Sequence, residues 1–80
     1  MTLQELRELL YKEAGMESIH AKIKQRALAG DSEVNFDYSN ENTPVEGKMN
    51  NRQAEILRKD GYIVEYNSAC LWYEVKGWDE

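Results

Sequence analysis

The sequence predicts an α+β fold of two layers, in which helices cover one face of a three-stranded, mainly antiparallel sheet. Apolar residues recur at three- and four-residue steps in the first third of the chain and again before residue 60. They alternate with polar residues near position 35 and in two consecutive runs after residue 61. The predicted order is therefore α-α-β-α-β-β, within a single domain that spans residues 1–80.

Three helices are predicted, covering residues 2–14, 16–29 and 50–60. Thr2 with Glu5 forms a predicted capping box at the start of the first helix, and Asn50 with Gln53 forms another at the start of the third helix. Gly15 separates the first two helices, although one bent helix is the alternative. The apolar stripe of the first helix consists of Leu3, Leu6, Leu10 and Ala14.

Three strands are predicted, covering residues 33–38, 62–67 and 70–75. The last two form a hairpin, because their apolar residues sort onto one face when Ser68 and Ala69 make a two-residue loop. The predicted inward pairs are Tyr66 with Leu71, Val64 with Tyr73, and Tyr62 with Val75. Any loop with an even number of residues keeps this sorting. Which hairpin strand the first strand joins stays open.

The acidic residues are concentrated in one segment. Residues 31–47 hold five carboxylates and no Lys or Arg, which equals the net charge of −5 for the whole chain. This segment includes an aperiodic loop over residues 39–48. A solvated surface is the plain interpretation, and a docking surface for a basic partner is the functional one. The predicted partner-binding residues are Asp31, Glu33, Asp37, Glu41, Glu46 and Trp72.

Trp72 joins that set because the predicted hairpin places it on the outer face, beside Ile63. Tryptophan is costly to leave in water and is enriched in binding hot spots. The alternative is that Trp72 packs against the C-terminal tail or beneath the long loop.

No catalytic, metal-binding or cofactor-binding residue is predicted, and we expect a protein that is not an enzyme. Cys70 and His20 are the only candidates for a nucleophile and its base, and no third residue orients them. One histidine and one cysteine also fall short of a zinc site, and the five scattered glycines form no phosphate-binding loop.

A single cysteine and the absence of a leader segment favour a reducing, cytoplasmic location. No apolar run is long enough to span a bilayer, so no membrane partner is expected. Lys22, Lys24 and Arg26 form a basic patch that suggests a nucleic-acid-binding module as the alternative function. A nucleotide- or small-molecule-sequestering oligomer is a third possibility, and a homodimer stays open.

The C-terminal part resembles a family of phage proteins. Asp60-Gly61-Tyr62-Ile63-Val64, then Leu71-Trp72-Tyr73-Glu74-Val75 and Trp78, resemble the end of small accessory proteins of tailed bacteriophages, and the Ile19–Gly30 helix resembles their preceding helix. The resemblance covers about 55 residues, carries packing motifs, and transfers no catalytic residue. It implies a host-cell location and a binding protein that inhibits a host or defence macromolecule, as anti-CRISPR proteins do.

Overall fold

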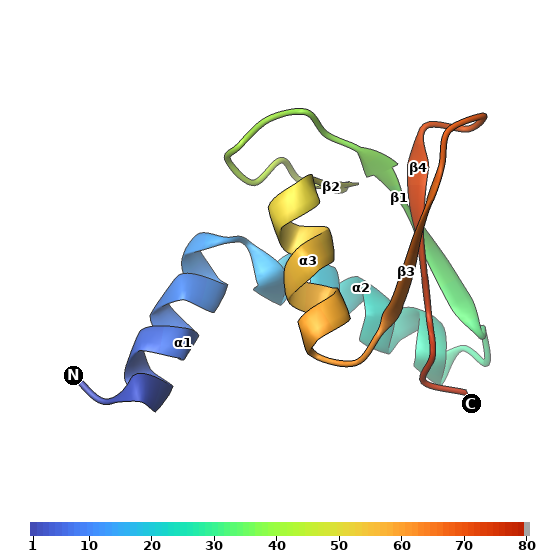
Figure 1. The fold of residues 1–80 in the computed structure, drawn as a ribbon. Helices are drawn as coiled ribbons and strands as arrows, with labels where there is room; N and C mark the ends of the chain where they lie inside the picture. Colours follow the sequence, from blue (N-terminus) through green and yellow to red (C-terminus); the bar gives the residue numbers. More distant parts are fainter. Residues whose placement is uncertain (80) are drawn as a thin grey trace.

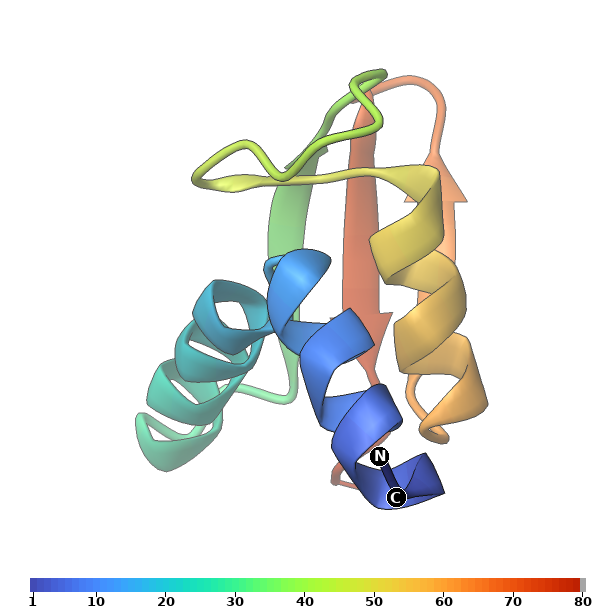
Figure 2. The same ribbon diagram turned by 90° about the vertical axis from the view of Figure 1, so that its left-hand side faces the viewer.

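The computed structural model describes residues 1–79, which form three helices and a four-stranded mixed sheet. The helices are α1 (Leu3–Glu13), α2 (Met16–Leu28) and α3 (Asn51–Lys59). The strands are β1 (Glu33–Tyr38), β2 (Lys48–Met49), β3 (Ile63–Asn67) and β4 (Trp72–Lys76). α2 and α3 lie side by side against one face of the sheet, and α1 lies beyond them, away from the sheet (Figure 1, Figure 2). The α+β class is as predicted.

The sheet differs from the prediction because it has a fourth strand and one parallel pair. Its order is β2-β1-β4-β3, with β1 antiparallel to β4 and parallel to β2. The predicted loop over 39–48 therefore ends in a strand, where Lys48 lies opposite Asp37 and Met49 opposite Tyr38. Met49 is fully buried, and its carbonyl accepts a hydrogen bond from the Ser39 amide at 2.9 Å. Two residues are too few to show the alternation that identifies a strand.

The β3–β4 hairpin is present, but its predicted register was wrong by two residues. Tyr66 lies opposite Tyr73 and Val64 opposite Val75, so four residues join the strands where two were predicted. The Asn67 side chain stabilises the longer turn, because its Oδ1 accepts hydrogen bonds from the amides of residues 69 and 70 at 3.0 and 3.1 Å. An even loop length preserves the sorting of the two faces, as predicted.

Leu71 was predicted to point inward, and this prediction was wrong. It lies in the turn with a φ of 57°, and it is 62% exposed. The first predicted inward pair, Tyr66 with Leu71, is therefore absent. Tyr66 instead joins Tyr38 and Tyr73 in a cluster of aromatic rings whose centroids are 5.3–6.0 Å apart.

Local hydrogen bonds explain where the helices begin. The Thr2 hydroxyl accepts from the Glu5 amide at 3.2 Å. Asn50 and Gln53 form the predicted reciprocal capping box, at 2.9 and 3.0 Å. α1 and α2 are separate helices, as preferred from the sequence, because Gly15 between them has a φ of 73° that interrupts the helical backbone.

The core lies between the sheet and the layer of α2 and α3. Gln53 is the polar residue that ties its parts together, at 2% exposure. Its Nε2 donates to the Ala14 carbonyl at 2.6 Å, and its Oε1 accepts from the Asn50 amide. One side chain thus joins the start of α3 to the end of α1. The buried apolar residues are Ala14, Met16, Ile19, Ile23, Val34, Phe36, Met49, Ala54, Leu57, Val64, Tyr73 and Val75.

α1 contributes little to this core. None of its residues is buried, and Leu3, Leu6 and Leu10 are 65%, 41% and 42% exposed. Of the predicted stripe, only Ala14, just beyond the helix, is in the core. The periodicity identified the helix correctly, but the side that this periodicity marked as apolar lies largely in solvent.

Candidate interaction surface

The candidate site is the sheet face that points away from α2 and α3 (Figure 1). Side chains alternate between the faces of a strand, so the neighbours of the buried residues point outward. Strand pairing aligns them in three rows, which are Asp37–Trp72–Asn67, Asn35–Glu74–Glu65 and Glu33–Lys76–Ile63. We call these nine residues the open face. Lys48 of β2 lies next to Asp37 and extends the first row, so the sheet presents four carboxylates and two ammonium groups on this side.

Trp72 lies on the open face, as predicted, and is half-buried, but it lies opposite Asn67 and not beside Ile63, which lies opposite Lys76. Its indole Nε1 donates to the Glu74 carboxylate at 3.2 Å, and the Asn67 amide donates to the same oxygen at 3.4 Å. These two hydrogen bonds lower the pKa of Glu74, with Lys76 acting in the same direction. The indole therefore lies along its own strand, held by a carboxylate that is ionised at neutral pH.

The remaining carboxylates of the open face differ in their pairing. Glu65 forms an ion pair with Lys76 at 3.2 Å, and this contact raises the pKa of Lys76. Within residues 1–79, no Lys, Arg or His nitrogen lies within 4.0 Å of the Glu33 or Asp37 carboxylate. Glu33 and Asp37 are exposed at the two ends of β1, where Glu33 lies opposite Lys76 and Asp37 lies between Trp72 and Lys48.

The structure does not bring all the predicted acidic residues together. Asp31 pairs with Arg26 at 3.6 Å, before β1 begins. Glu41 lines a hollow of about 300 Å³ at the start of α3. Glu46 lines a hollow of about 750 Å³ next to α2, on the helical side of the sheet. Of the predicted set, only Glu33, Asp37 and Trp72 share the open face.

Two carboxylates of the open face were missed from the sequence. Glu65 and Glu74 lie directly opposite each other on β3 and β4. Their outward positions follow from the predicted hairpin, which already paired outward residues across the strands. Their proximity to Asp37 and Glu33 depends on the pairing of β1 with β4, which the sequence left open.

The basic patch of α2 lies on a different surface. Lys22 donates to the Asn35 carbonyl at 3.1 Å and lies over the Phe36 ring at 4.7 Å, while Arg26 is paired with Asp31. Because α2 covers the helical side of the sheet, these cations and Trp72 do not form one surface (Figure 2).

His20 and Cys70 lie near opposite ends of β3. The His20 imidazole hydrogen-bonds the Tyr11 hydroxyl and contacts the ring of Tyr62, which precedes β3, whereas Cys70 is exposed in the turn that follows β3. Five strand residues separate the two ends, which is roughly 16 Å. Burial lowers the pKa of His20, partly opposed by the charge of Asp60. The pair is not arranged as nucleophile and base.

Comparison of the chain with protein-family models, with curated proteins and with solved structures finds no match.

Within residues 1–79, no group of three or more His, Cys, Asp or Glu side chains is placed to hold a metal ion. No helix in this part of the chain has the length and apolar character needed to cross a bilayer.

Proposed function

We propose that this protein is a non-enzymatic binding protein whose open face docks onto a basic protein surface. The observation that carries the proposal is the position of Trp72 beside Asp37, whose carboxylate forms no ion pair, on a sheet face that also carries Glu33, Glu65 and Glu74. Such a surface offers an aromatic contact at one end, with charged groups next to it.

Electrostatics favours a basic partner. The chain carries a net charge of −5, and this side of the sheet carries four carboxylates with two ammonium groups, those of Lys76 and Lys48. A phosphate backbone is repelled by such a surface, whereas a protein channel or groove that binds nucleic acid is attracted to it. The basic residues of α2, on the other side of the sheet, give the nucleic-acid-binding alternative less support.

The biological class of the partner rests on the sequence resemblance alone. Small accessory proteins of tailed bacteriophages suggest a host or defence protein as the target, and inhibition by occupation of its nucleic-acid-binding surface as the mechanism. A bacterial lysate is therefore the appropriate source of partner for the first experiment.

Affinity capture with matched variants tests the proposal. The immobilised chain is expected to capture a basic protein that elutes as salt is raised. The double variant Glu33→Lys/Asp37→Lys and the variant Trp72→Ala are expected to lose it, whereas the control Glu5→Lys/Glu8→Lys on α1 keeps it. Capture of nothing by the folded chain, or equal capture by all variants, contradicts the proposal.

A further inference from the structure

Among residues 1–79, no strand pairs with the edge of β1 beyond β2. β2 pairs only with Asp37 and Tyr38, so residues 33–36 are unpaired on that side. The Tyr38 amide donates toward β4, to the Leu71 carbonyl at 3.0 Å. Backbone groups point alternately to the two sides of a strand, so those of Glu33 and Asn35 point to the unpaired edge. The hydrogen bond from Lys22 to the Asn35 carbonyl reaches it from that side.

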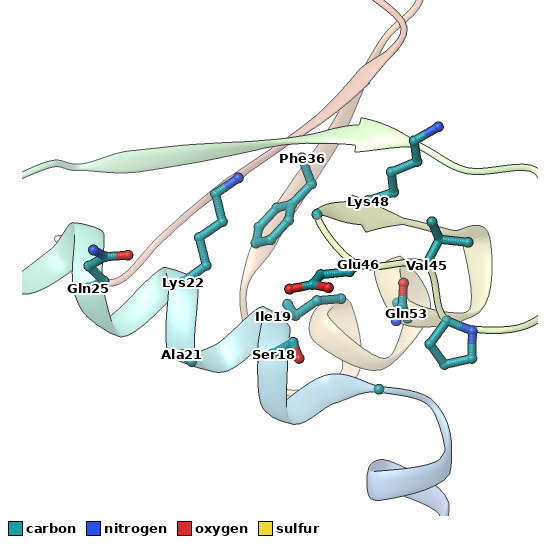
Figure 3. A pocket seen from close by; sticks show the side chains of 13 residues that line it. Ser18, Ile19, Ala21, Lys22, Gln25, Phe36, Val45, Glu46, Lys48 and Gln53 are labelled. Carbon is teal, nitrogen blue, oxygen red and sulfur yellow. The ribbon is translucent and has the colours of Figure 1, made fainter.

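Two hollows follow this edge and meet at Lys22, which lines both. One, of about 750 Å³, lies between α2, Phe36 and residues 44–48. The other, of about 360 Å³, lies between Arg26 and residues 33–35. Figure 3 shows the Lys22 side chain rising from α2 toward β1, with the Glu46 carboxylate in the larger hollow. Together the hollows form a groove beside the unpaired backbone.

We propose that this groove binds an extended peptide, which adds a strand to β1 next to β2. Unpaired strand edges recognise extended chains through main-chain hydrogen bonds, and adjoining pockets select side chains. Residues 33–36 accommodate three or four peptide residues at about 3.3 Å each. This binding site shares Glu33 and Asn35 of β1 with the open face but does not include Trp72, and it does not rest on the function proposed for that face.

The opposite edge of the sheet also has one carbonyl bonded by a side chain. On β3, the guanidinium of Arg58 donates twice to the Val64 carbonyl, at 3.2 Å from Nε and 3.0 Å from Nη2. On β1, one flexible lysine makes a single bond to the Asn35 carbonyl. The peptide is expected to displace the Lys22 side chain, so that a peptide amide donates to the Asn35 carbonyl in its place.

Lys22, Lys48 and Arg26 line the two hollows together with Asp31, Glu33 and Glu46, so the groove favours a basic side chain of the peptide at one place, beside Glu46. Within the described residues, Glu46 has no cation within 4.0 Å, and its carboxylate lies among the residues that line the larger hollow. Val45 and Pro44 provide apolar lining beside it. A Lys or Arg side chain next to a small apolar one fits this arrangement.

The test uses dodecapeptides selected from a random displayed library against the full-length chain, with affinities measured by fluorescence anisotropy. Asn35→Pro removes the amide at the edge, where proline is tolerated, and is expected to weaken binding on the order of tenfold. Asn35→Thr keeps that amide and is expected to bind as the parent does. Thermal melts establish that both variants are folded.

Two further variants keep the test decisive if Asn35→Pro does not fold. Lys22→Met frees the Asn35 carbonyl and is expected to tighten binding severalfold, whereas Glu46→Gln weakens it. Trp72→Ala is expected to change nothing, which separates this site from the open face. The proposal is overturned if the library yields no peptide that binds the folded chain. It is also overturned if affinity is unaffected by Lys22→Met and Glu46→Gln, or depends on Trp72.

Discussion

Substitution of Gly15 by alanine tests how the two helical segments and the long loop fit together. Gly15 has a φ of 73°, and a Cβ added there would lie 2.6 Å from the Cβ and 2.9 Å from the Cγ of Pro44. The left-handed backbone costs a non-glycine residue about 1–2 kcal/mol, and overpacking costs about 1–3 kcal/mol more. The lower entropy of the unfolded variant returns about 0.4–1 kcal/mol. Gly15→Ala is therefore expected to lower the free energy of unfolding by about 2–4 kcal/mol.

Gly30→Ala is the matched control, because Gly30 has a φ of 92° and no neighbour within 4 Å of the added Cβ. At Gly30 only the cost of the left-handed backbone remains, and the lower entropy of the unfolded variant offsets part of it. The free energy of unfolding is therefore expected to fall by about 0.5–1.5 kcal/mol. Urea denaturation followed by circular dichroism measures the free energy of unfolding of both alanine variants. The contact with Pro44 accounts for the difference, and Pro44→Gly in the Gly15→Ala background should recover part of it. Equal losses in the two alanine variants would refute this account of the Gly15 contact.

Two further predictions concern buried polar groups. Gln53→Met removes the hydrogen-bond partners of the Ala14 carbonyl and the Asn50 amide. The free energy of unfolding, measured by urea denaturation, is expected to fall by about 2–4 kcal/mol. A fall of less than about 1 kcal/mol would contradict this role of Gln53. Burial lowers the pKa of His20 from 6.5, so the unfolded chain protonates at higher pH than the folded chain, and stability should decline as pH falls below 6.5. Between about pH 7 and pH 5, the melting temperature of His20→Gln should fall less than that of the parent chain. An identical fall in both would argue against His20 as the source of the pH dependence.

Local patterns in the sequence predicted the helices and the sorting of the hairpin faces. The capping box at Asn50 and the helix break at Gly15 are features of a few consecutive residues, and the structure contains both. The alternation of Val64, Tyr66, Tyr73 and Val75 also survives the change in register, because the loop length stays even.

What the sequence could not predict depends on contacts between distant segments. β2 forms because Met49 is drawn into the core beside β1, and a two-residue strand has no periodicity of its own. The turn that contains Leu71 depends on hydrogen bonds from the Asn67 side chain. The exposure of the α1 leucines follows from where that helix lies, which its amphipathic pattern does not specify.

The candidate site was predicted in part for the same reason. Alternation along β1 placed Glu33 and Asp37 on one face, and hairpin pairing placed Trp72 on an outer face. The antiparallel pairing of β1 with β4 joins those faces, and this non-local contact has no local pattern in the sequence. Grouping by charge alone also included Glu46, whose loop carries it to the helical side.

The fluorescence of Trp72 tests most directly whether the open face is the contact surface. In the variant Trp78→Phe, Trp72 is the only tryptophan, and it is half-buried in the unbound chain. Saturation with the captured protein is expected to shift its emission to shorter wavelength and to protect it from iodide quenching, because the partner removes water from the indole. Unchanged emission and quenching at saturation would show that the partner binds elsewhere.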